Sequence, residues 1–356
     1  MFIKEYKTTL DKYEAFWERK NEKRPILNIA YKKAGAVPYR LPVSPEEKYL
    51  EVGYRYNAFK HDMANTGYLA EGIPMCFTNF GPGCLAACIG GSFQLARDSV
   101  WFDTVQLVED WEKPPVIALN EQSVMWQKIL EAQGLYASDP DVHFSITDLG
   151  GIMDVVASLR GTENLLYDLY DYPEEVRKFT VEVKREWFKA LDKQLAIVAD
   201  ANQPYNNWMN IPSSKPWYPI QCDFCYMISP EHFEEFVLPD IVDQVNYLDR
   251  SIYHLDGPGE LPHVDMLLDI PNLTGIQWTS GDGNAPLTDE KWYGLYRKIQ
   301  DKKKNLVLLG AITENDLAGA ERLIKSIDST GVYISIACSS KEKAEEILEK
   351  ITRWAE

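Results

Sequence analysis

The stretch Ser251-Ile-Tyr-His-Leu-Asp-Gly-Pro-Gly259 decides the fold prediction, because it reads as a strand with an abrupt end. Its first half is rich in β-branched and aromatic residues, and its Gly-Pro-Gly close is a strong turn signal. His254 and Asp256 are two residues apart, so on an extended backbone both side chains leave the same face. The stretch therefore predicts a strand that delivers an imidazole and a carboxylate together, just before a glycine-rich loop. A polar strand end that faces solvent is the simpler alternative.

The sequence that follows this strand alternates regularly between short apolar runs and longer amphipathic segments. The expected strands are 251–256, 274–279, 305–312 and 331–338, and the expected helices are 260–269, 288–302, 314–327 and 340–354. This alternation is typical of a parallel sheet with helices outside it.

Further strand candidates near residues 25, 74, 142 and 220 bring the total to about eight. That number favours a closed (β/α)8 TIM barrel, and no G-x-G-x-x-G follows a strand as a dinucleotide-binding sheet would require. A chain of 356 residues suits one such domain, 1–356. We expect a helical extension over 1–24 and an irregular insertion near 80–118.

The composition excludes several classes of protein. The chain is 45% hydrophobic and 26% charged with a net charge of −17, so it buries a core but lacks the basic patch of a nucleic-acid binder. The acidic balance also disfavours anionic membranes, and no apolar run is long enough to span a bilayer. The N-terminus has no signal-peptide core, and six cysteines do not make a disulfide scaffold in a chain of this length. We therefore expect a cytoplasmic protein with reduced thiols.

The active site of such a barrel lies at the carboxyl ends of its strands. The polar residues expected there are Asp148, Cys222, Asp223, His254, Asp256, Gln277, Thr279, Cys338 and Ser339. Five strand ends thus converge on side chains that bind metals or move protons.

Three of these residues, His254, Asp256 and Cys338, are candidate ligands of Zn²⁺. Cys222, Asp223, water or substrate would take the fourth position, as in catalytic zinc sites with one open position. Zinc would stabilise a thiolate or an alkoxide at neutral pH. The alternative for Cys338 is a small apolar residue that closes the last strand.

The remaining candidates support a chemistry without metal. Asp148, Asp223 and Asp256 could hold basic nitrogens or act as acid and base. Asp148, Asp223 and Gln277 are the catalytic candidates. Cys222 and Cys225 form a C-x-x-C, but on a strand the two would face opposite sides, which disfavours a redox pair.

Aromatic residues could wall a pocket for a flat or methylated ligand. The candidates are Tyr205, Trp208 and Trp278. In a chain with 12% aromatic residues, core packing is the plainer explanation for them.

Three stretches resemble the uroporphyrinogen decarboxylase-like superfamily, which includes decarboxylases and cobalamin-dependent methyltransferases. They are Asp148–Gly161 running into Glu163–Glu174, Cys222–Glu231 with Phe236-Val-Leu-Pro239, and Ser251–Gly257 with the terminal Ala337-Cys338. The likeness covers roughly residues 120 to 354. The last stretch falls where the methyltransferase branch has its zinc-binding H-x-C and a late Cys.

The chain departs from both branches of this superfamily. Asp256 stands where the methyltransferases have Cys, which makes the ligand set harder. The arginine-rich motif of the decarboxylases has only Lys32, Lys33 and Arg40 as counterparts, and their late His is absent near Cys338.

The resemblance implies a zinc-dependent methyltransferase that moves a methyl group between a small methylated substrate and a separate corrinoid protein, since the chain has no second domain for cobalamin. The alternatives are a metal-free decarboxylase (a lyase) acting on a tetrapyrrole and a non-catalytic ligand-binding barrel.

Overall fold

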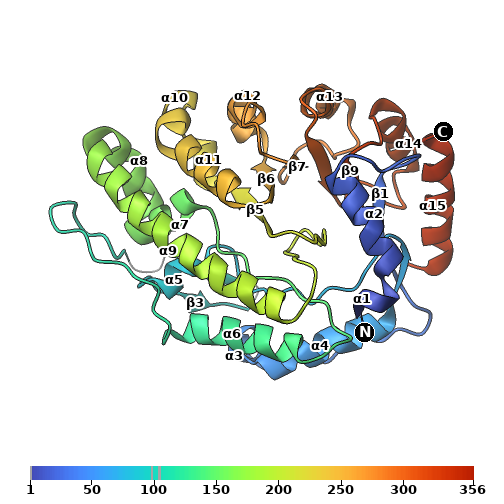
Figure 1. Ribbon diagram of the computed structural model, residues 1–356, viewed down its shortest axis with the longest axis horizontal. Helices are drawn as coiled ribbons and strands as arrows, with labels where there is room; N and C mark the ends of the chain where they lie inside the picture. Colours follow the sequence, from blue (N-terminus) through green and yellow to red (C-terminus); the bar gives the residue numbers. More distant parts are fainter. Residues whose placement is uncertain (1, 98, 103–105) are drawn as a thin grey trace.

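The computed structural model describes residues 2–97, 99–102 and 106–356 (Figure 1). Within these ranges the main sheet has seven strands in the order β2-β1-β9-β8-β7-β6-β5. Their bounds are β1 (Ile26–Lys32), β2 (Thr66–Ala70), β5 (Trp217–Gln221), β6 (Arg250–Asp256), β7 (Gly275–Thr279), β8 (Asn305–Leu309) and β9 (Val332–Cys338). β2 is antiparallel to β1, and the other neighbours are parallel.

The alternation expected in the second half of the chain is present. The intervening helices are α10 (Pro230–His232), α11 (Leu238–Tyr247), α12 (Val264–Leu268), α13 (Tyr293–Asp301), α14 (Leu317–Ser326) and α15 (Lys341–Trp354). Figure 1 shows them along one side of the sheet, from α10 at the top to α15 beside the C-terminus. The side chain of Ser340 caps α15 by accepting from the backbone of Lys343, and that of Ser229 caps α10 in the same way.

Closure of the sheet differs from the sequence-based expectation. The segments near residues 74 and 142 are not sheet strands; they meet in one parallel bridge, Cys76 to Phe144. Instead of pairing along its length, the second segment contacts the loop between α9 and β5, where Ile146 N donates to Asn206 O at 3.1 Å. Strand pairing in the described residues thus runs from β2 to β5 and does not form a complete ring. The architecture is an α/β fold around a mostly parallel sheet.

The N-terminal helices fill one end of the sheet. The predicted extension is α1 (Phe2–Glu5) and α2 (Lys7–Trp17), and α2 buries Tyr13, Phe16 and Trp17. These rings join a cluster with Trp217, Ile252, Val307 and Tyr333, residues near the starts of the strands. Because apolar side chains occupy that end, the carboxyl ends of the strands remain for chemistry.

Longer helices lie on the other side of the molecule. They are α4 (Val52–Asn65), α6 (Val124–Ala137), α7 (Ile152–Arg160), α8 (Thr162–Asp171) and α9 (Pro173–Asp200), with the short α3 (Pro45–Tyr49) before α4. Within the described residues, no helix is both long and apolar enough to cross a membrane. The insertion expected near 80–118 holds only α5 (Cys84–Cys88) and the small hairpin of β3 (Gln94–Leu95) and β4 (Val100–Trp101) as regular elements among its described residues.

Candidate metal centre

Three side chains at the strand ends form a group with the geometry of a metal site. The ligand atoms of Asp223, His254 and Asp256 all lie within 4.8 Å of one another, and no other such group of three occurs in the described residues. His254 and Asp256 leave one face of β6, as their spacing predicts. Asp223 opens η1 (Asp223–Met227), directly after β5, whose Gln221 lies opposite His254.

Two neighbours fix the imidazole of His254. Its Nδ1 is hydrogen-bonded to Oε1 of Gln277, the residue opposite it on β7. Because the amide oxygen accepts, Nδ1 carries the proton and Nε2 keeps a free lone pair for a metal ion. The Trp208 ring meets the imidazole edge-on, with ring centres 5.1 Å apart. Gln277 and Trp208 thus fix the orientation of the imidazole.

Asp154, which the sequence analysis did not single out, holds the backbone of Asp223. Its carboxylate, in the first turn of α7, accepts from Asp223 N at 3.1 Å and from Phe224 N at 2.8 Å. Burial, with Asp223 nearby, raises the pKa of Asp154 to about 7. A side chain at Gly151 would come within 2.2 Å of Gln221 O, so only glycine allows this approach. The Gly-Gly before a helix with an acid in its first turn is the sequence signal that could have revealed Asp154.

Several buried acidic side chains surround this group of three ligands. Burial raises the pKa of Asp148 and of Asp223, and it raises the pKa of Glu260 to about 11. Glu260 is 1% exposed, and its Oε1 has no hydrogen-bond partner. No Lys or Arg in the described residues forms an ion pair with these three acids, with Asp154 or with Asp256. The site therefore favours a cation.

Asp148 lies beside this group. Its Oδ1 accepts from the hydroxyl of Tyr218 at 3.0 Å and from Gly150 N at 2.9 Å. The pKa of Asp148 responds to the charges of both Asp223 and His254, which places it within electrostatic reach of the candidate ligands.

Cys338 lies on the opposite face of the sheet from the three ligands. Cys338 and Tyr333 are separated by an odd number of positions on β9, so their side chains leave opposite faces of the sheet. Tyr333 packs in the same cluster as Ile252, whereas Cys338 packs with Ile334 and Ile336 on the helical side. The structure therefore does not bring Cys338 to His254 and Asp256.

Cys222 also points away from the group. It is 1% exposed and packs in the helical-side core. η1 begins at the next residue, so Cys225 follows one helical turn later and the two thiols are neighbours; the expectation of opposite faces was wrong because the strand ends at Gln221. Burial and the neighbouring Cys225 raise the pKa of Cys222.

Of the three aromatic candidates, only Trp208 contacts the candidate ligands. Trp278 is fully buried and packs edge-on against Trp292, with ring centres 5.0 Å apart. Tyr205 pairs its backbone with Ser213 and packs on the core. Trp278 and Tyr205 therefore have packing roles.

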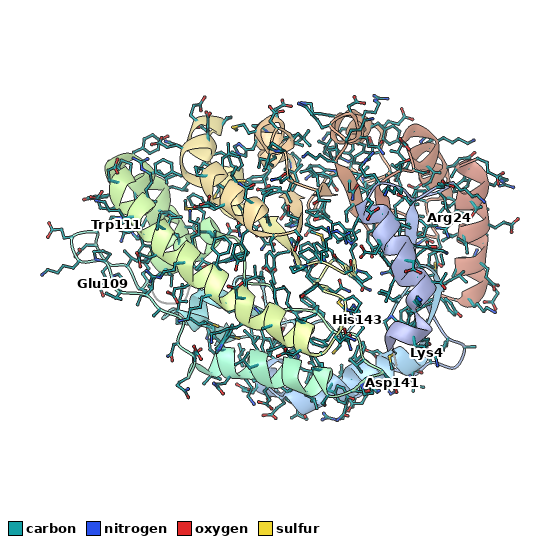
Figure 2. The ribbon with its side chains drawn as sticks, viewed as in Figure 1. Lys4, Arg24, Glu109, Trp111, Asp141 and His143 are labelled. Atoms are coloured by element: carbon teal, nitrogen blue, oxygen red, sulfur yellow. The ribbon has the colours of Figure 1, made fainter. Side chains whose placement is uncertain are left out.

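A larger cavity lies elsewhere. Its volume is about 730 Å³, and its lining includes Lys4, Lys33, Lys60 and Asp141. Figure 2 shows Lys4 and Asp141 near the foot of the N-terminal helices. Three lysines and none of the candidate metal ligands line this cavity, so it is distinct from the metal centre.

Comparison with known proteins finds similarity among solved structures. No protein-family model and no curated protein matches the chain. A solved methyltransferase from Methanosarcina mazei has a similar structure, with a TM-score of 0.64 and 12% identity over 98% of this chain and 99% of that one. At this identity the likeness shows the fold alone.

Proposed function

We propose that the chain is a zinc-dependent methyltransferase that moves a methyl group between a small methylated substrate and a separate corrinoid protein. The group Asp223, His254 and Asp256 carries the proposal, because it joins a prepared imidazole to two carboxylates without basic partners. The fold shared with a methyltransferase, and the sequence resemblance to the uroporphyrinogen decarboxylase-like superfamily with its barrel, support the transfer chemistry.

The donor set fits a divalent cation. One nitrogen and two carboxylate oxygens are an accepted catalytic set for Zn²⁺, and the two negative charges balance the charge of the ion. The set contains no thiolate, since Cys338 and Cys222 lie on the helical side of the sheet. A ligand set of one nitrogen and two oxygens is chemically harder than one with a thiolate, and it would leave at least one coordination position open for substrate.

The protein's own residues would prepare and complete the transfer. Loss of a methyl group leaves an electron pair on the substrate's oxygen or sulfur, and a bound zinc ion would stabilise that charge as a Lewis acid. Gln277 holds the Nδ1 side of His254, which leaves Nε2 as the ring nitrogen for a metal ion. Asp148 has its Oδ1 occupied, which leaves Oδ2 to exchange a proton with the released heteroatom.

Metal analysis tests the proposal. Protein purified without chelator is expected to hold about one zinc per chain, and His254→Ala is expected to weaken zinc binding by about 100-fold or more, because the remaining carboxylates lose their only nitrogen partner. Asp256→Asn is also expected to weaken zinc binding, and Asp301→Asn, at the exposed end of α13, is its matched control with unchanged zinc affinity. Absence of zinc, or equal zinc affinity in wild type and His254→Ala, would contradict the proposal.

The same variants test the transfer itself. Free methylcobalamin with a simple thiol as acceptor is a suitable probe, and its absorbance change reports demethylation. Wild type is expected to accelerate the change, and His254→Ala to lose the acceleration while its circular dichroism spectrum stays the same.

The raised pKa values of Asp148 and Asp223 favour a second candidate, a metal-free decarboxylase that holds tetrapyrrole nitrogens. Tight binding of a porphyrinogen by metal-free protein, with release of carbon dioxide, would support it over the methyltransferase. Because no Lys or Arg among the residues that the structure describes forms an ion pair with the site's acids, a polycarboxylated substrate is the less favoured ligand.

A further inference from the structure

A second cavity adjoins the metal centre and shares Asp223 with it. Its volume is about 340 Å³, the size of a site for a small organic molecule. Residues Val100–Phe102 form one part of its lining, and Phe224 and Met227 form another. A molecule in this cavity has one end beside the candidate metal ligands.

The charge of the lining selects the ligand. Asp154 and Asp223 contribute carboxylates, and none of the described lining residues is Lys or Arg. Zinc would neutralise Asp223 together with Asp256, but Asp154 lies outside the ligand group. An anionic ligand would be buried against carboxylate oxygens with no compensating charge, which costs free energy, whereas a cation gains a partner.

The apolar part of the lining favours the same kind of ligand. Trp101 is 56% exposed and Met227 is 49% exposed, so an indole and a thioether stand open to solvent in the lining. Phe102 and Phe224, which also belong to the lining, are almost fully buried. Aromatic faces attract ammonium groups, above all methylated ones that carry few hydrogen-bonding protons.

We propose that this cavity binds the head of the methyl-group substrate, and that the substrate is a cation: an alkylammonium compound with its methyl ether or thioether a few atoms from the nitrogen. The ammonium lies against the aromatic lining and Asp154, and the oxygen or sulfur reaches the metal beside Asp223. This inference rests on the proposed function and names its substrate class. The reacting C–O or C–S bond breaks so that the methyl leaves as a cation equivalent to the reduced corrinoid, and the heteroatom keeps the electron pair.

Three thiols that differ in charge test the proposal. Thiocholine is cationic, 3,3-dimethylbutane-1-thiol is its neutral isostere, and 3-mercaptopropionate is anionic; each has a sulfur for the metal. On zinc-loaded protein, calorimetry is expected to show thiocholine binding about tenfold tighter than the isostere, with the anion weakest. Affinities within about twofold of one another would overturn the proposal.

Variants of the lining test whether the preference for a cationic ligand arises in this cavity. Trp101→Ala is expected to weaken thiocholine binding by about threefold to tenfold and to leave the isostere less affected, because the indole contributes a cation–π contact. Tyr167→Ala, an exposed aromatic residue of α8 outside the cavity, is the control. An unchanged thiocholine affinity in Trp101→Ala would overturn the assignment to this cavity.

A chelator separates the two proposals. If the chain binds no zinc, the methyltransferase proposal fails, and a Trp101-dependent preference for choline in metal-free protein would still support a cation site. If zinc binds and the preference for the cation disappears once the metal is loaded, the attraction belongs to the empty ligand group and the cavity proposal fails.

Discussion

His143 provides a stability test of the segment that leads to Asp148. Its side chain is fully buried, its Nδ1 is 2.9 Å from Oε1 of Gln203, and its Nε2 is 2.9 Å from Nδ2 of Asn206 (Figure 2 shows its position). These bonds connect the segment to the loop that carries Trp208. Burial lowers the pKa of His143 from 6.5 to about 4. The folded protein therefore keeps this ring neutral.

The pKa shift sets the sign and size of a pH effect. The unfolded chain binds a proton at His143 near pH 6.5, while the folded chain does so only near pH 4. The contribution to stability is thus complete above pH 6.5 and is lost as the pH falls toward 4. Between about pH 7.5 and about pH 4.5 the free energy of unfolding falls by about 2.5 kcal/mol because of this residue.

Urea unfolding at both pH values, in the presence of chelator, measures the effect. His143→Asn no longer titrates, and its amide can still donate to Gln203. The stability lost by wild type on acidification is expected to exceed that lost by His143→Asn by about 2.5 kcal/mol, while His61→Asn, on the partly exposed side of α4, behaves as wild type. Equal losses in wild type and His143→Asn would refute the argument that buried, neutral His143 controls acid stability.

Two further predictions concern the metal centre. Gln277→Ala leaves the His254 ring unoriented, so we expect zinc affinity measured by calorimetry to fall by about 10- to 100-fold, with Gln122→Ala in an exposed loop as control. Cys338→Ser is expected to change zinc affinity by less than about twofold, because its thiol lies on the helical side of the sheet; a large loss would place Cys338 among the ligands.

Much of the fold could be predicted from the sequence because its signals are local. The apolar runs at 251–256, 274–279 and 331–338 agree with β6, β7 and β9 within about one residue, and the helix predicted over 340–354 begins directly after its cap Ser340. The prediction of sheet strands near 74 and 142 was wrong because an apolar run shows that a segment is buried but does not show which segment it pairs with.

The candidate site, too, could be predicted from the sequence only in part. His254 and Asp256 could be paired because strand periodicity fixes their common face. Cys338 shares a face of β9 with Ile334 and Ile336, and burial alternates only over the second half of this strand, because its first three residues are all buried. Trp208 and Asp154 contribute through long-range contacts to His254 and Asp223, and the sequence did not show which residues these contacts would join.

The sequence by itself determined an α/β chain whose strand 251–256 presents an imidazole and a carboxylate before a glycine turn. Only the tertiary structure decided that Asp223, and not Cys338, completes the group, and that an acidic, aromatic cavity adjoins it. The physical reason is that hydrophobic periodicity sets which residues are buried, while strand register and the end of β5 at Gln221 set which polar atoms meet.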